Sequence, residues 1–125
     1  MAKILIVDDS PTETYRFRQV LEKAGHEVLE AHSGEDGVKM TKANFVDLVL
    51  MDVVMPGLNG FQATRQLSKD AATSEVPVII VTTKDQETDR VWGKRQGAVG
   101  YLTKPVTDSV LLKAAERVLA GEVLV

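Results

Sequence analysis

The chain has 125 residues, of which 44% are hydrophobic and 26% are charged, as expected for one ordinary globular domain with its own core. Its net charge of −3, from 18 acidic and 15 basic residues, argues against a nucleic-acid-binding surface, which needs clustered base. Cysteine is absent, which excludes disulfides, thiolate zinc sites and cysteine nucleophiles. With no signal-peptide pattern and no apolar stretch near the roughly 20 residues of a membrane helix, we expect a cytoplasmic protein without membrane insertion.

The chain begins with a strand, a helix and a second strand. Lys3–Val7 is a short apolar run that predicts a buried strand. Ser10 and Glu13 then form the pattern of a capping box, with proline at the first helical position. Apolar residues follow at helical spacing until Gly25, which is expected to end the helix. Glu27–Ala31 predicts a second strand, near a sheet edge because it carries two charges.

The middle of the chain repeats this alternation. A short helix is expected to open at Ser33 and to end near Ala43. Leu48–Met51 is fully apolar and predicts a central strand. Met55–Gly60 is rich in residues that break regular structure. A further helix is expected over Phe61–Lys69.

The last part of the chain predicts two more strands and two more helices. Val76–Val81 predicts a strand with Pro77 at its entry, where a missing N–H is tolerated. A charged helix over Gln86–Gln96, a short strand over Val99–Leu102 and a helix over Asp108–Leu119 are expected to follow. The expected inward face of the last helix consists of Leu111, Ala114, Ala115 and Val118.

Five strand–helix alternations predict the fold class. They indicate βαβ crossovers, hence an α/β protein with a doubly wound parallel sheet and helices on both faces. We expect a single domain over residues 1–125 with no attached effector domain. If the strands take the flavodoxin-like order 2-1-3-4-5, a common order for such sheets, the first and third strands are neighbours.

Three carboxylates then gather at one edge of the sheet. Asp8 and Asp9 follow the first strand, and Asp52 follows the third. Ligands bind outside the carboxyl edge of such sheets. Clustered carboxylates repel one another unless a cation lies among them, and Mg²⁺ prefers oxygen ligands. We therefore predict a Mg²⁺ site with metal-assisted phosphate chemistry.

Asp52 is the candidate nucleophile, because a carboxylate can accept a phosphoryl group. The plainer alternative is an aspartate that caps the following loop or helix. Asp8 and Asp9 could likewise cap the first helix, but Ser10 already supplies a cap there. Thr82 could donate a hydrogen bond to a phosphoryl oxygen, or simply end a buried strand.

Lys104, Tyr101 and Trp92 also have two interpretations each. Lys104 directly precedes a proline after the fifth strand, where it could reach the acidic cluster or remain a surface lysine. Its bond to that proline could be cis. Tyr101 could be plain core or a side chain with two positions. Trp92 could contact a partner or pack on the sheet.

Taken together, these residues resemble the receiver domain of bacterial two-component response regulators. The resemblance covers essentially the whole chain and rests on ordered motifs at matching spacings. These motifs are Asp8-Asp9, Asp52, Met55-Pro56-Gly57 with Gly60, Thr82 and Lys104-Pro105. Gly60–Leu67, Thr82–Asp89 and Val91–Ala98 resemble, more closely, stand-alone receivers of chemotaxis-like systems that control type IV pilus twitching motility.

The resemblance implies a role for each site residue. Asp52 would accept a phosphoryl group from a sensor histidine kinase or its phosphotransfer domain. Asp9, Asp52 and the backbone carbonyl of Val54 would bind Mg²⁺ directly, and Asp8 mostly through water. Lys104 would pair with the phosphoryl oxygens.

The resemblance also implies a switch and an output. Thr82 would move toward the phosphoryl group and let Tyr101 swing inward. This would reshape the face formed by the fourth helix, fifth strand and fifth helix, to which a pilus-motor or regulatory protein would bind. Such a protein is a phosphoacceptor that assists its own phosphorylation and hydrolysis, so we regard it as a signalling protein rather than an enzyme.

Two other functions remain open. The chain could be a phosphate sink or phosphorelay intermediate without a dedicated output partner. A flavodoxin-like cofactor binder belongs to another class, but the acidic Asp8-Asp9 loop would repel a flavin phosphate that lacks a metal.

Overall fold

The computed structural model describes all 125 residues and contains five parallel strands that alternate with five helices. The strands are β1 (Lys3–Val7), β2 (Glu27–Ala31), β3 (Leu48–Met51), β4 (Val78–Thr82) and β5 (Gly100–Thr103). The helices are α1 (Pro11–Lys23), α2 (Gly34–Ala43), α3 (Gly60–Lys69), α4 (Glu87–Arg95) and α5 (Asp108–Leu119). None of these helices has the length and apolar character needed to cross a membrane.

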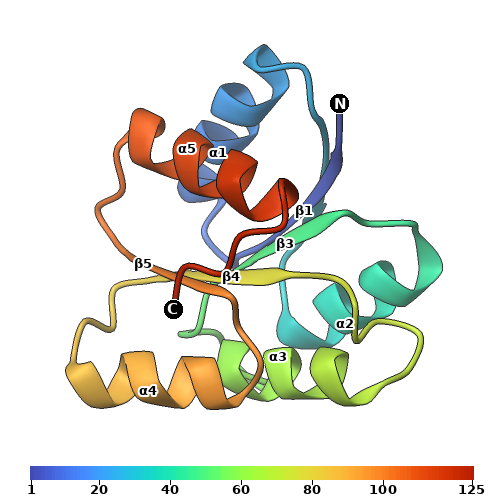
Figure 1. The fold of residues 1–125 in the computed structure, drawn as a ribbon, viewed down its shortest axis with the longest axis vertical. Coiled ribbons are helices and arrows are strands. Elements are labelled where there is room, and N and C mark those ends of the chain that lie inside the picture. The colour runs from blue at the N-terminus through green and yellow to red at the C-terminus, as the bar shows by residue number, and fades with distance from the viewer.

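The strands form one sheet in the order β2-β1-β3-β4-β5, which confirms the predicted flavodoxin-like (βα)5 fold. Figure 1 shows α1 and α5 on one face of the sheet and α2, α3 and α4 on the other. Successive strand residues point to opposite faces, so Ile4 and Ile6 belong to the core under α1 and α5, whereas Leu5 and Val7 belong to the core under α2 and α3. The inward face predicted for α5 is confirmed.

Local sequence signals account for most helix boundaries. The side chains that cap helix N-termini by accepting a backbone N–H are Ser10, Ser33, Asn59 and Thr107. Gly25 follows α1 with a φ of 95°, a left-handed conformation that glycine adopts without steric cost. The predicted start of α1 at Ser10 and its end before Gly25 are therefore confirmed. α3 and α4 begin and end within one residue of the prediction.

Two strand boundaries differ from the prediction. The fourth strand was expected over Val76–Val81, but β4 starts two residues later and includes Thr82. Pro77 stays outside the strand because it has no N–H for the ladder, although its carbonyl accepts the Val49 N–H at 3.0 Å. The fifth strand was expected over Val99–Leu102, and β5 lies one residue further along. Both strands therefore extend toward the edge where the carboxylates lie.

Candidate functional site

Neighbouring strands bring the three predicted carboxylates to one edge of the sheet. Val7 of β1 pairs with Met51 of β3, so the chain leaves both strands at the same level. The residues that follow, Asp8 and Asp9 after β1 and Asp52 after β3, each offer one carboxylate oxygen, and these oxygens lie within 4.8 Å of one another.

This cluster has the donor chemistry of a divalent-cation site. Asp8 is 2% exposed and Asp52 8%, whereas Asp9 is exposed to solvent. All the donors are hard oxygens, the type that Mg²⁺ prefers, and the exposed carboxylate leaves room for the waters that Mg²⁺ retains. The three aspartates could therefore hold Mg²⁺. The role of the Val54 carbonyl as a further ligand stays a prediction.

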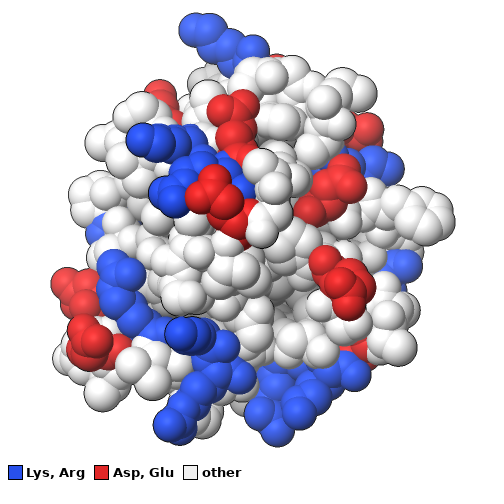
Figure 2. Space-filling model, in the orientation of Figure 1, with Lys and Arg blue, Asp and Glu red and all other residues white.

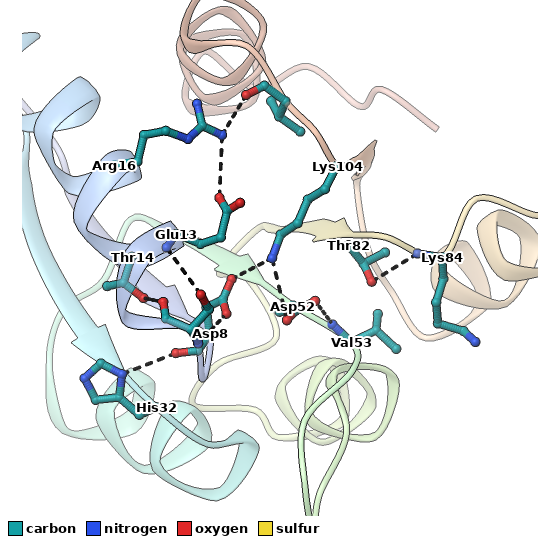
Figure 3. Close-up of polar contacts among 12 residues, drawn as sticks. Asp8, Glu13, Thr14, Arg16, His32, Asp52, Val53, Thr82, Lys84 and Lys104 are labelled. Atoms are coloured by element: carbon teal, nitrogen blue, oxygen red, sulfur yellow. Dashed lines mark hydrogen bonds and ion pairs between the residues drawn. The ribbon is translucent and has the colours of Figure 1, made fainter.

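Lys104 reaches into the cluster from the end of β5. Figure 3 shows its side chain pointing between Asp8 and Asp52. Its Nζ lies 2.9 Å from Asp8 Oδ2 and 3.7 Å from Asp52 Oδ2. The side chain is only 10% exposed, so it is not a surface lysine. The bond between Lys104 and Pro105 is cis.

Burial and the charges in the site shift the pKa values of Asp52 and Lys104. Burial raises the pKa of the Asp52 carboxyl; the Lys104 ammonium opposes this rise and the charge of Asp8 adds to it. Burial alone would lower the pKa of Lys104, but its hydrogen bond with Asp8 and the charge of Asp52 outweigh burial and raise it. Three carboxylates thus face one ammonium. The excess negative charge favours a bound cation.

Thr82 and Tyr101 are connected through Lys84. Thr82 is fully buried and its Oγ1 accepts the Lys84 N–H at 3.4 Å. The hydroxyl of Tyr101 donates to the Lys84 carbonyl at 2.7 Å, and Tyr101 is 5% exposed. The loop that carries Lys84 therefore joins the candidate switch residue at the site to the aromatic residue of β5. Whether Thr82 and Tyr101 move together stays a prediction.

The contacts at the start of α1 differ from a complete capping box. Ser10 caps the helix as predicted, but its N–H donates to Asp8 Oδ1 at 2.9 Å rather than to Glu13. Asp8 lies only two residues before Ser10, and its other carboxylate oxygen is held by Lys104, so Asp8 Oδ1 is in reach of the Ser10 N–H. The Glu13 carboxylate instead pairs with Arg16 at 3.5 Å (Figure 3), and its charge makes a small contribution to the raised pKa of Lys104. No sequence pattern indicated these contacts of Glu13.

The backbone after β3 is held by close contact with Gly60, the first residue of α3. The Val53 N–H donates to Asp52 Oδ1 at 2.8 Å, and the Gly60 N–H donates to the Val53 carbonyl at 3.0 Å. A Cβ at Gly60 would lie 1.9 Å from the Asp52 carbonyl oxygen. Only glycine therefore lets the start of α3 lie against the Asp52 backbone, which orients the carboxylate. The sequence marked Gly60 as part of a loop but did not indicate this contact.

Comparisons with known proteins agree with this geometry. Residues 4–116 match the family profile described as the response regulator receiver domain. Protein PilH of Pseudomonas aeruginosa is 69% identical over 121 residues, which cover 97% of this chain and all of that protein. The response regulator PleD of Caulobacter vibrioides is 37% identical over 88% of this chain but only 24% of its own length.

The fold is also similar to solved structures. The chemotaxis protein CheY4 of Vibrio cholerae superposes with a TM-score of 0.89 at 32% identity, over 94% of this chain and 98% of that chain. A putative response regulator from Chloroflexus aurantiacus superposes with a TM-score of 0.91 at 30% identity, over 95% and 98% of the two chains.

Proposed function

The chain belongs to the response regulator receiver family, and on that premise we propose that it is a stand-alone two-component response regulator phosphorylated on Asp52. The observation that carries the proposal is the convergence of Asp52 with two other carboxylates and a buried Lys104. Asp52 directly follows the central strand β3 and keeps 8% of its surface exposed.

The chemistry is an in-line phosphoryl transfer. An Asp52 Oδ attacks phosphorus in a phosphohistidine of a sensor kinase or its phosphotransfer domain. The new O–P bond forms while the P–N bond breaks, and its electron pair returns to the imidazole. Mg²⁺ held by Asp8, Asp9 and Asp52 would neutralise the charge of the incoming phosphoryl group.

Lys104 and Thr82 bind the phosphoryl oxygens in this proposal. The Lys104 ammonium already lies 3.7 Å from the Asp52 carboxylate, so it would pair with a phosphoryl group there. Thr82 would exchange its contact with Lys84 for one to the phosphoryl group. Because Tyr101 donates to the same Lys84 residue, this exchange would loosen the loop before α4. A phosphoryl group can bias a two-state element only by such differential contacts.

The proposed biological setting is a chemotaxis-like system that controls type IV pilus twitching motility. The support is the 69% identity with PilH over the whole of that protein. A pilus-motor or regulatory protein would bind the face formed by α4, β5 and α5. The phosphodonor would be a histidine kinase or its phosphotransfer domain.

The proposal is tested by intact-mass analysis after incubation with Mg²⁺ and acetyl phosphate. We expect one phosphoryl adduct on the wild type, no adduct on Asp52→Ala and no adduct with EDTA. Asp36→Asn is the matched control, because Asp36 is an exposed carboxylate on α2 that is not part of the cluster. An adduct that persists in Asp52→Ala, or a folded wild type that takes up none, would overturn the assignment.

A further inference from the structure

α3 and α4 carry an uneven distribution of charge. Residues 59–69 and 90–98 contain five basic residues and no acidic residue, although the whole chain has a net charge of −3. Figure 2 shows blue Lys and Arg atoms gathered along the lower side of the molecule, where Figure 1 places α3 and α4. The five basic residues are Arg65, Lys69, Arg90, Lys94 and Arg95.

Most of these cations have no partner within the protein. Elsewhere, several exposed bases pair with carboxylates, as Lys42 does with Asp70 at 2.8 Å and Arg117 with Glu122 at 2.9 Å. Other exposed lysines, such as Lys23 and Lys113, stand singly on their helices rather than in a group. Arg90 donates to the Tyr101 carbonyl at 3.4 Å. The exposed bases of α3 and α4 that form no ion pair or hydrogen bond are Arg65, Lys69, Lys94 and Arg95.

Helix dipoles explain only part of this pattern. Lys69, Lys94 and Arg95 lie in the last turns of their helices, where the dipole favours a cation. Arg65 lies in the middle of α3, where that effect has faded. The C-terminal halves of the two helices are joined, because Ser68 Oγ donates to the Gln96 carbonyl at 2.7 Å. The bases of α3 and α4 therefore belong to one continuous surface.

The orientation of α4 places its tryptophan on the side of α3. Arg90 contacts β5 through Tyr101 and Thr103, so that flank of the helix faces β5. Successive residues are rotated by about 100°, so Trp92 lies roughly opposite Arg90, on the flank that faces away from β5. Arg95, three residues later, lies beside Trp92. Trp92 is 49% exposed.

We propose that this α3–α4 basic surface, consisting of Arg65, Lys69, Trp92 and Arg95, docks an acidic segment of a partner protein. Charge complementarity selects the partner, since four exposed residues supply three unpaired cations around one aromatic side chain. Trp and Arg are the residues most often found at interface hot spots. The surface is separate from the α4–β5–α5 face and goes beyond the proposed function, because it does not require phosphorylation.

Two other anionic partners fit the surface less well. An anionic membrane needs a broad apolar helix face, whereas the exposed face of α3 carries the polar residues Gln62 and Gln66 in addition to its bases. Nucleic acid needs a larger excess of base over the domain, and this chain is acidic overall. An acidic protein segment requires only a local patch.

Trp92 provides a direct readout, because it is the only tryptophan in the chain. The full chain is titrated at physiological ionic strength with a short peptide rich in Glu and Asp that also carries leucines. We expect its emission to shift to shorter wavelength as the peptide covers Trp92. The double variant Arg65→Glu/Lys69→Glu should raise the Kd by about tenfold or more, because it replaces attraction with repulsion.

The matched control is Lys23→Glu/Lys113→Glu, which makes the same change in net charge on α1 and α5, on the opposite face of the sheet. It should change the Kd by less than about twofold. Equal weakening in the control would overturn the proposal, as would absence of any shift in emission. Tighter binding of an RNA oligonucleotide or of phosphatidylglycerol vesicles than of the peptide would also overturn it.

The same variants separate this inference from the proposed function. Both double variants should take up a phosphoryl group on Asp52 as the wild type does, because neither changes the carboxylate cluster. Peptide binding should be the same with and without beryllofluoride, a phosphoryl mimic. A Kd that depends strongly on the mimic would place the peptide on the switched face instead and contradict a separate surface.

Discussion

α4 and α5 both flank the edge strand β5, but they are held to the sheet in different ways. α5 buries Leu111, Ala114, Ala115 and Val118 in the core, whereas α4 buries only Gly93. The exposed apolar side chains of α4, Val91 and Trp92, are 45% and 49% exposed. Apolar burial is the main stabilising term for a docked helix, so α5 is firmly fixed and α4 is weakly held.

Specific contacts replace apolar burial at α4. Gly93 rests against Ile80 and the Tyr101 ring, and Arg90 donates to the Tyr101 carbonyl. Tyr101 in turn donates to the Lys84 carbonyl, in the loop that precedes the helix. We therefore expect that a small change at this loop would move α4 more readily than α5. Elements that respond to a ligand generally come from the least stable part of a fold.

The largest effect should come from shortening a buried side chain of α5. Leu111 is fully buried, so Leu111→Ala should lower the free energy of unfolding by about 2–5 kcal/mol. Val91→Ala on α4 removes a half-exposed side chain and should cost about 0.5 kcal/mol or less. Urea unfolding measures both. Similar losses in the two variants would contradict the difference between the helices.

A medium effect is expected where α4 touches the sheet. A Cβ at position 93 would lie 3.0 Å from Ile80 Cδ1 and 3.1 Å from Tyr101 Cδ2. Gly93→Val adds a branched side chain in this space and should cost about 1–3 kcal/mol through overpacking. In Gly93→Ala, the tight contact is offset by a helix propensity gain of about 1 kcal/mol. Urea unfolding followed by Trp92 emission measures the stability of both variants. If Gly93→Val lowers the free energy of unfolding no more than Gly93→Ala does, the close contact at Gly93 does not hold α4 on the sheet.

A further effect, confined to alkaline pH, should come from Tyr101. Burial, with the charge of Asp89, raises the pKa of Tyr101 to about 12, against about 10 in an unfolded chain. The folded state thus keeps a proton that the unfolded state loses. The resulting stability is complete below pH about 10 and is lost as pH rises toward about 12.

This loss should be absent in Tyr101→Phe, which has no phenol to titrate. The variant also lacks the hydrogen bond to Lys84, so it should be less stable than the wild type at neutral pH by about 1 kcal/mol. Denaturant unfolding at a series of alkaline pH values measures the difference. Identical pH dependence in the two proteins would contradict the raised pKa of Tyr101, and equal stability at neutral pH would show that its hydrogen bond to Lys84 contributes nothing.

Much of the fold could be predicted because the signals are local. The cap at Ser10 and the stop at Gly25 each act within one helical turn, and both were confirmed. The predicted start of β4 was wrong, because the prediction counted Pro77 as part of the strand. Pro77 has no N–H to donate to the neighbouring strand, so β4 begins after it. Only half of the predicted capping box forms: Ser10 Oγ accepts the Glu13 N–H, but the Ser10 N–H donates to Asp8 instead of Glu13.

For the site, too, the residues placed by local signals were predicted, and those placed by long-range contacts were not. Asp8 and Asp52 could be placed together because each directly follows an apolar strand, and parallel strands share one edge. The sequence left open whether Lys104 reaches the cluster or stays at the surface, since its burial depends on a contact with Asp8, which is 96 positions away in the chain. The influence of Glu13 on the pKa of Lys104 could not be predicted, because an acidic residue at this position is also expected in the first turn of a helix.

The sequence by itself determined the order of the elements, their caps and the edge of the sheet at which the carboxylates gather. These properties follow from hydrophobic periodicity and from backbone chemistry within a few residues. The tertiary structure alone decided that Lys104 lies buried between Asp8 and Asp52, and that Trp92 is half-exposed rather than packed in the core. Both depend on the twist of the sheet and the rotation of a docked helix, which are set by packing between segments far apart in the chain.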